Sequence, residues 1–170
     1  MKKFFVYFAI MLVSLSIQTS AVPLFFSFGH MPDFVLMLVL AWAIIDGFNL
    51  FFWWAVFLGI LYDLISFSFV GSYAIIFILL VYGVSFLSKR FRVEMNASGM
   101  VVIYFLVLLS TIGEKIMLIF YNFGIAGIGS EFSNFFPLIK SLTIISMYNF
   151  IFFFFWFFVI KKIKKYFLFT

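Results

Sequence analysis

Six apolar blocks, separated by short polar breaks, occupy most of the 170-residue chain. A helix of roughly 20 apolar residues crosses the hydrocarbon core of a bilayer, which is about 30 Å thick. Only 10% of the residues are charged, against about a quarter in soluble proteins. The sequence therefore predicts an all-α integral membrane protein with a single membrane domain, and the expected spans lie at about residues 4–26, 31–45, 49–67, 72–87, 98–121 and 138–160.

The positions of the basic residues indicate how many times the chain crosses the membrane. Lys and Arg collect on cytoplasmic loops. With the N-terminus inside, six crossings place all three basic clusters on the cytoplasmic side, whereas joining the second and third blocks into one helix moves the middle cluster to the outside. We therefore predict six transmembrane helices with both termini in the cytoplasm. The clusters are Lys2 and Lys3; Lys89, Arg90 and Arg92; and Lys161, Lys162, Lys164 and Lys165.

The second and third blocks are separated by Asp46-Gly47-Phe48-Asn49. Glycine tolerates positive φ angles, and Asp or Asn side chains bond to nearby backbone groups. These residues predict a tight turn on the cytoplasmic side.

The first block also has features of a secretory signal, because Lys2 and Lys3 precede an apolar stretch that ends at Thr19-Ser20-Ala21. Cleavage of residues 1–21 is therefore an alternative. We expect a retained helix, since the apolar run continues to Phe26 and is long enough to cross the bilayer.

Asp63 is the most informative charged residue within a span, where a charge costs about 2.5–3.5 kcal/mol at the helix centre. Ala55, Gly59 and Asp63 follow one another at intervals of four and share a helix face. Small residues let another helix approach closely, and that helix can then offer a donor to the carboxylate. Two interpretations stay open: packing within the chain, with Gly71 in the polar turn that follows, or binding of a partner protein.

Pro32 and Asp33 open the second span. Proline suits the first positions of a helix, and Asp caps free N–H groups there. A helix start explains both residues, and Ser14 and Gln18 in the first block are expected to form hydrogen bonds between helices.

Glu114 and Lys115 lie side by side in the fifth block, and Lys140 opens the sixth. Adjacent residues on a helix point in different directions, so Glu114 and Lys115 are not an automatic pair. Lys140 is expected to reach Glu114 or to extend toward the interface. We predict intramembrane charge pairing, not a proton or ion relay, because no chain of such groups continues to the inner side.

The sequence contains no group of residues suited to a reaction centre. The chain has no cysteine, and its single histidine, His30, has no cluster of metal-ligating residues around it. Serine hydrolysis within the membrane would need a histidine in a span to act as base. The glycines at 124, 127 and 129 lack the strand and helix of a phosphate-binding loop. We expect no enzyme activity, metal or cofactor, and we attribute the net charge of +5 to topology and not to nucleic-acid binding.

Two segments resemble the family of the rod shape-determining protein MreD. One is the Pro-Asp entry into a short apolar helix at residues 32–40. The other runs from Gly59-Ile60-Leu61-Tyr62-Asp63-Leu64 through Gly71 to a span that ends in Lys89-Arg90. The resemblance covers roughly residues 31–92, while the C-terminal half agrees in hydropathy.

This resemblance implies a noncatalytic component of the bacterial elongation machinery in the inner membrane. Such a protein pairs with MreC, and through it connects MreB to the peptidoglycan synthases RodA and a class B penicillin-binding protein. The family's fold is similar to that of the substrate-binding (S) subunits of energy-coupling-factor vitamin transporters. On this basis the outer half, with Asp33, Asp63 and Glu114, is the expected partner surface.

An S subunit of such a transporter is also the main alternative function. It would have a similar size and six helices, with a glycine-rich outer loop such as residues 124–130 closing over a ligand. It would also need a patch of small residues on the first helix to dock an energising module, and Ala9 stands nearly alone there. A membrane protein of unrelated role is the third possibility.

Overall fold

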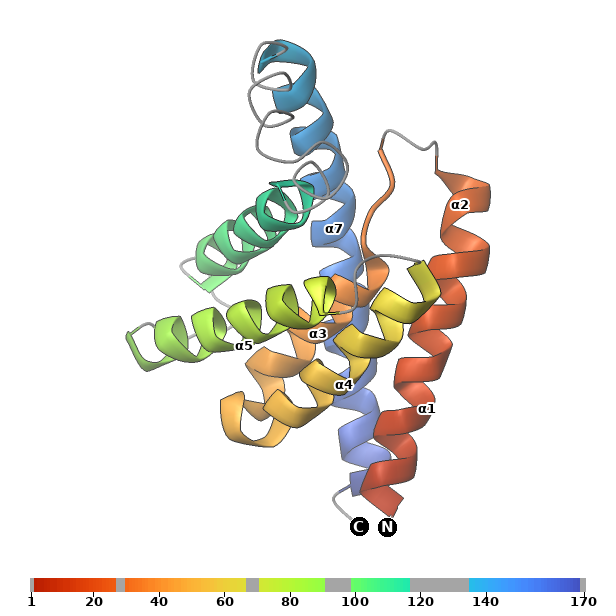
Figure 1. Ribbon diagram of the computed structural model, residues 1–170. Helices are drawn as coiled ribbons and strands as arrows, with labels where there is room; N and C mark the ends of the chain where they lie inside the picture. The colour runs from red at the N-terminus through yellow and green to blue at the C-terminus, as the bar shows by residue number, and fades with distance from the viewer. Residues whose placement is uncertain (1, 27–29, 67–70, 91–98, 117–134, 169–170) are drawn as a thin grey trace.

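A computed structural model describes residues 2–26, 30–66, 71–90, 99–116 and 135–168 (Figure 1). Regular structure in these ranges is entirely helical, and each of the six apolar blocks contains helix. The elements are α1 (Lys2–Ser16), η1 (Ile17–Ala21), α2 (Val22–Phe25), α3 (Phe34–Asp46), α4 (Phe48–Ser66), α5 (Ser72–Arg90), a helix at Gly99–Ile116, α7 (Phe135–Ile163) and η2 (Lys164–Leu168).

The first block forms one continuous rod in which a wider π turn, η1, joins α1 to α2. Pro23 lies in the first turn of α2. Because proline has no N–H and its ring clashes with the carbonyl four residues earlier, regular α-helix is disfavoured there. The π turn immediately before Pro23 is a local solution to that conflict.

Helix α3 forms the centre of the molecule. It has 13 residues, which corresponds to about 20 Å and is shorter than the bilayer core. Its residues from Phe34 to Ala43 are all buried, and it contacts α1, α4, α5 and α7. A helix that is apolar on every side is typical of a buried position. The other helices therefore separate α3 from lipid.

The predicted tight turn between the second and third blocks is confirmed. Helix α3 ends at Asp46, Gly47 has a φ of 75°, and α4 begins at Phe48. The Gly47 N–H donates to the Ala43 carbonyl oxygen at 3.0 Å. Only glycine adopts this backbone conformation without strain.

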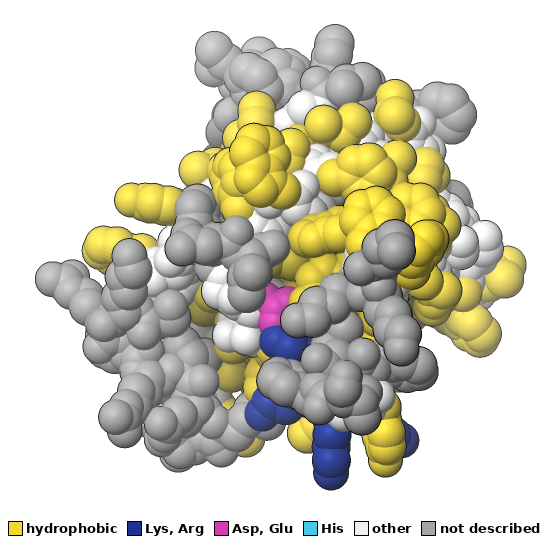
Figure 2. Space-filling view, turned by 90° about the horizontal axis from the view of Figure 1, so that it is seen from below, with side chains coloured by type: hydrophobic (Ala, Val, Ile, Leu, Met, Phe, Trp, Pro, Cys, Tyr) yellow, Lys and Arg dark blue, Asp and Glu magenta, His cyan; other side chains and the backbone are white. Residues whose placement is uncertain are grey.

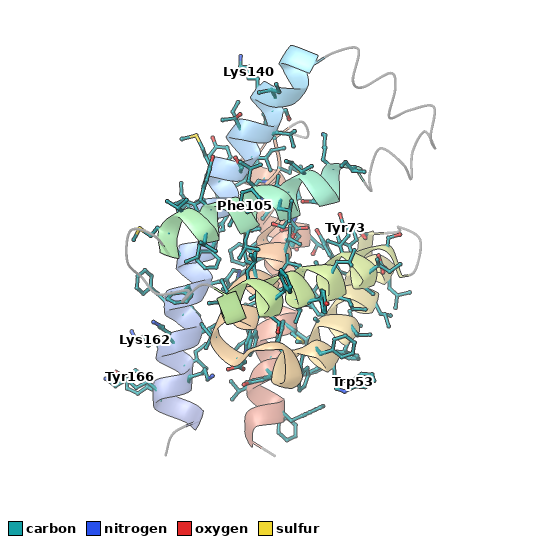
Figure 3. All side chains as sticks on the ribbon, turned by 90° about the vertical axis from the view of Figure 1, so that its left-hand side faces the viewer. Trp53, Tyr73, Phe105, Lys140, Lys162 and Tyr166 are labelled. Atoms are coloured by element: carbon teal, nitrogen blue, oxygen red, sulfur yellow. The ribbon has the colours of Figure 1, made fainter. Side chains whose placement is uncertain are left out.

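Three helices are long and apolar enough to cross a membrane: Phe4–Phe25, Gly99–Ile116 and Ile139–Tyr166. Helices α3, α4 and α5 supply three shorter apolar segments. Helix α5 and the Gly99–Ile116 helix run crosswise to α1 and α7 in both ribbon views (Figures 1 and 3). The six helices therefore do not form a simple parallel bundle.

The surface of these helices is strongly apolar. Large side chains are exposed on α1, α5, the Gly99–Ile116 helix and α7, among them Phe5, Leu79, Val101 and Ile151. Patches of this extent need an apolar solvent. The chain is an integral membrane protein.

Several helix boundaries differ from those expected, for example the start of α3 at Phe34 in place of 31 and the end of α5 at Arg90 in place of 87. Helix α7 begins at Phe135 and continues to Ile163, where the prediction was 138–160. It continues because lysines in a last turn complement the helix dipole while their stems stay in apolar surroundings. In the fifth block the described helix ends at Ile116, so expected residues 117–121 lie outside the described part of the chain.

Candidate functional site

Asp33 caps the N-terminus of α3, at the position that the sequence predicts for the helix start. Its Oδ1 accepts a hydrogen bond from the Leu36 N–H at 2.7 Å. The side chain is 1% exposed, and Pro32 beside it is also buried.

Side chains from two other elements bind the same helix start. Gln18 in η1 accepts from the Phe34 N–H at 2.7 Å and donates to the Pro32 carbonyl at 3.3 Å. Asn149 in α7 accepts from the Asp33 N–H at 2.9 Å.

Helix α7 makes two further bonds in this region. Asn149 also donates to the Thr111 hydroxyl oxygen at 2.9 Å, and the Trp156 indole N–H donates to the Phe34 carbonyl at 3.0 Å. Free backbone groups are costly in lipid, and here they are satisfied by η1 and α7. The start of α3 is therefore fixed between the first and last helices.

One oxygen of the Asp33 carboxylate, Oδ2, is buried and has no hydrogen-bond partner among the described residues. We predict that Asp33→Asn unfolds at or above the wild-type temperature, because Asn caps helices as well as Asp and carries no buried charge. Asp33→Leu should lose about 0.5–2 kcal/mol with the cap. Thermal unfolding in detergent compares the two variants. Equal losses for Asn and Leu would contradict this account of the carboxylate.

Asp63 binds the start of α5. Its two oxygens accept from the Gly71 N–H at 2.7 Å and from the Tyr73 N–H at 2.9 Å. Asp63 is fully buried, and Gly71 has a φ of 108°. The carboxylate therefore holds the chain where it enters α5, and Gly71 supplies a backbone conformation that other residues rarely adopt.

The face formed by Ala55, Gly59 and Asp63 packs directly against α5. A Cβ atom placed on Gly59 would lie 2.4 Å from the Ala74 Cα. Ala55 is also fully buried. The helix that approaches this face belongs to the same chain, so a partner's helix has no room there.

Between the described residues, the structure shows no ion pair of Glu114, Lys115 or Lys140, and their charge pairing stays a prediction. Glu114 and Lys115 are half-buried, whereas Lys140 is exposed. Lys140 lies at the opposite end of α7 from Lys162 (Figure 3).

Asp46 has a structural role beyond its predicted place in the turn. Its Oδ2 accepts from the Tyr7 hydroxyl at 2.6 Å and from the Trp42 indole N–H at 2.8 Å. Its Oδ1 forms an ion pair with Lys164 in η2. The buried carboxylate thereby connects the beginning of α1 with the end of α7, and Figure 2 shows acidic and basic side chains together on this face.

An apolar groove runs between α5 and the Gly99–Ile116 helix, with a cavity of about 240 Å³. A Cβ atom on Gly83 or Gly113 would meet nothing within 4 Å, so both glycines border open space. The Ser110 hydroxyl donates to the Val107 carbonyl oxygen at 2.8 Å. Because its proton is used within its own helix, Ser110 adds little polarity to the groove. We call this the glycine groove; it is lined by Ile76, Leu79, Leu80, Gly83, Leu106, Leu109, Ser110 and Gly113.

The polar residues described here bind helix ends and join helices. Among the described residues, no group of three or more His, Cys, Asp and Glu side chains could hold a metal ion. The glycine groove is an apolar surface cavity whose lining includes two glycines with open space beside them.

Comparison with known proteins identifies the family. The family model described as rod shape-determining protein MreD matches residues 1–167. No curated protein and no solved structure matches the chain, so the likeness to S subunits stays a prediction. The match extends over nearly the whole sequence, including the apolar helices and the Asp33 and Asp63 helix caps. The chain belongs to the MreD family of rod shape-determining membrane proteins.

Proposed function

We propose that this protein is a noncatalytic scaffold of the bacterial cell-elongation complex in the inner membrane. It crosses the membrane six times as a single domain, keeps both termini in the cytoplasm and binds the transmembrane helix of an MreC-type partner. Through that partner it acts with MreB, RodA and a class B penicillin-binding protein, and supports peptidoglycan synthesis and cell shape.

The paired ends of the chain support this orientation. The beginning of α1 and the end of α7 lie at the same end of the molecule, as an even number of crossings requires (Figure 1). Lys161 and Lys162 in the last turn of α7 gather there with the lysines of η2, in agreement with the excess of basic residues on cytoplasmic surfaces.

The glycine groove is the observation that supports partner binding. Apolar side chains gain little from leaving lipid for protein, so helices in membranes associate where small residues allow close backbone approach. Gly59 already serves this purpose against α5. Gly83 and Gly113 offer the same opportunity to a helix from outside the chain, over about two turns on each wall.

Filling the groove is expected to release the partner. We predict that the double variant Gly83→Leu, Gly113→Leu retains wild-type yield and a single size-exclusion peak, because the added side chains enter open space. Co-purification of an MreC-type partner should fall at least tenfold, since the bulky side chains occupy the place of the incoming backbone.

Ser16→Leu on the exposed face of α1 is the matched control, because it adds a comparable side chain to another lipid-facing surface. It should recover the partner in full. Full recovery by the double groove variant as well would overturn the proposed docking site.

A further inference from the structure

A second cavity, of about 340 Å³, lies at the end of the molecule where α1 begins and α7 ends. Its lining consists of Ile45, Lys161, Lys164 and Lys165, and we call it the basic pocket. Figure 2 looks at this end and shows basic side chains beside hydrophobic ones. The pocket lies next to the Asp46 ion pair and shares no lining residue with the glycine groove.

The three lysines of the basic pocket are not equivalent. Lys164 is fixed by its ion pair with Asp46, whose carboxylate is buried. Lys161 and Lys165 are exposed, lie four residues apart and therefore share one helix face. In the part of the chain that the structure describes, neither is paired with an acidic residue. The pocket thus presents two uncompensated positive charges, held beside a third that is fixed in place.

The surroundings of the basic pocket are apolar. Ile45 forms part of its wall, and the Lys161 ammonium lies 4.4 Å from the centre of the Phe157 ring. Phe158 is exposed on the turn before the pocket, and Tyr166 is exposed just beyond it. Tyrosine is enriched where a membrane meets water, and phenylalanine suits the apolar layer beside it. A ligand at this position can place an anionic group among the lysines and apolar chains along α7.

We propose that the basic pocket binds the headgroup phosphate of an anionic phospholipid in the cytoplasmic leaflet. Basic pockets between transmembrane helices on this side attract such headgroups. The bound phosphate would bridge Lys161 and Lys165, while the apolar part of the lipid packs against Ile45 in the last turn of α3. The lipid therefore stabilises the contact between the last helix and the core, independently of any partner in the glycine groove.

The test uses the purified full-length chain, freed of lipid by detergent exchange. Phosphatidylglycerol is the anionic probe, phosphatidylcholine the zwitterionic control and inorganic phosphate the control for a free anion. We expect phosphatidylglycerol to raise the unfolding temperature and to remain bound in native mass spectrometry. Phosphatidylcholine and inorganic phosphate should do neither.

The decisive comparison is between two charge variants. Lys161→Gln with Lys165→Gln removes the two uncompensated charges and leaves the Asp46–Lys164 pair intact. Lys162→Gln removes an exposed charge from the same helix that does not line the pocket. The double variant should bind phosphatidylglycerol at least fivefold more weakly, and the control should bind like wild type.

Equal binding by the double variant and the Lys162→Gln control would overturn the pocket. An equal response to phosphatidylcholine would overturn the requirement for an anionic headgroup. Stabilisation by inorganic phosphate alone, as large as that by phosphatidylglycerol, would show that the site takes a free anion and would overturn the lipid assignment.

Discussion

Gly59→Ala is expected to disrupt the packing of α4 against α5 and to lower the yield of folded protein severely. The new Cβ atom would lie 2.4 Å from the Ala74 Cα and 2.7 Å from its backbone nitrogen. No rotamer change relieves a clash with backbone, so the two helices must move apart. Overpacking of a well-packed core costs about 1–3 kcal/mol, and occasionally more. Because the clash at Gly59 is with backbone atoms, we expect a loss of stability at the upper end of this energy range.

Gly83→Ala is the matched control, because it makes the same chemical change in a helix where nothing lies within 4 Å of the new atom. It should express and unfold like wild type or slightly better, since alanine favours helix over glycine. Size-exclusion profiles and unfolding temperatures in one detergent compare the two variants. Equal stability of Gly59→Ala and Gly83→Ala would contradict the observed approach of α5 to α4.

Asp63→Leu is expected to free the start of α5. The substitution removes both acceptors of the Gly71 and Tyr73 N–H groups. Each buried donor left without a partner costs about 1–3 kcal/mol. Asp63→Asn keeps one carbonyl acceptor and should show an intermediate loss.

The measurement combines thermal unfolding with amide hydrogen exchange. The Gly71 and Tyr73 amides should exchange faster in Asp63→Leu than in wild type, and amides within α7 should not change. A variant that unfolds at the wild-type temperature with protected amides at 71–73 would show that Asp63 does not hold this helix start.

Local features of the fold could be predicted from the sequence. The apolar blocks predicted the helical segments because helix formation in lipid depends on hydropathy and length. The Pro32-Asp33 pair predicted the start of α3, and Gly47 predicted the turn, because caps and turns depend on neighbouring residues. The spacing of Ala55, Gly59 and Asp63 identified a close-packing face, although not the helix that occupies it.

Long-range contacts could not be predicted in this way. Asn149 binds the Asp33 backbone across 116 positions, and Lys164 binds Asp46 across 118. Hydropathy does not indicate which helices touch, so Asp46 was assigned only to its turn. A sequence signal for it was present in Trp42, four residues earlier on the same helix face, whose indole needs an acceptor.

The crosswise direction of α5 and the Gly99–Ile116 helix could not be predicted for the same reason. Their apolar composition predicts burial in lipid but not their angle to α1 and α7 (Figure 1). That angle leaves the glycine groove between them, and neither Gly83 nor Gly113 lies in a recognisable sequence motif. Their proposed role in partner binding depends on the open space beside them, which only the three-dimensional structure reveals.

The most direct test of the account is to locate the partner's helix. The chain has no cysteine, so Gly113→Cys introduces a single thiol into the groove. Oxidation in membranes should join it to an MreC-type partner carrying cysteines at successive positions of its transmembrane segment, with yields repeating every three to four residues. Crosslinks that form instead from Ser16→Cys on α1, and not from Gly113→Cys, would contradict the proposed groove.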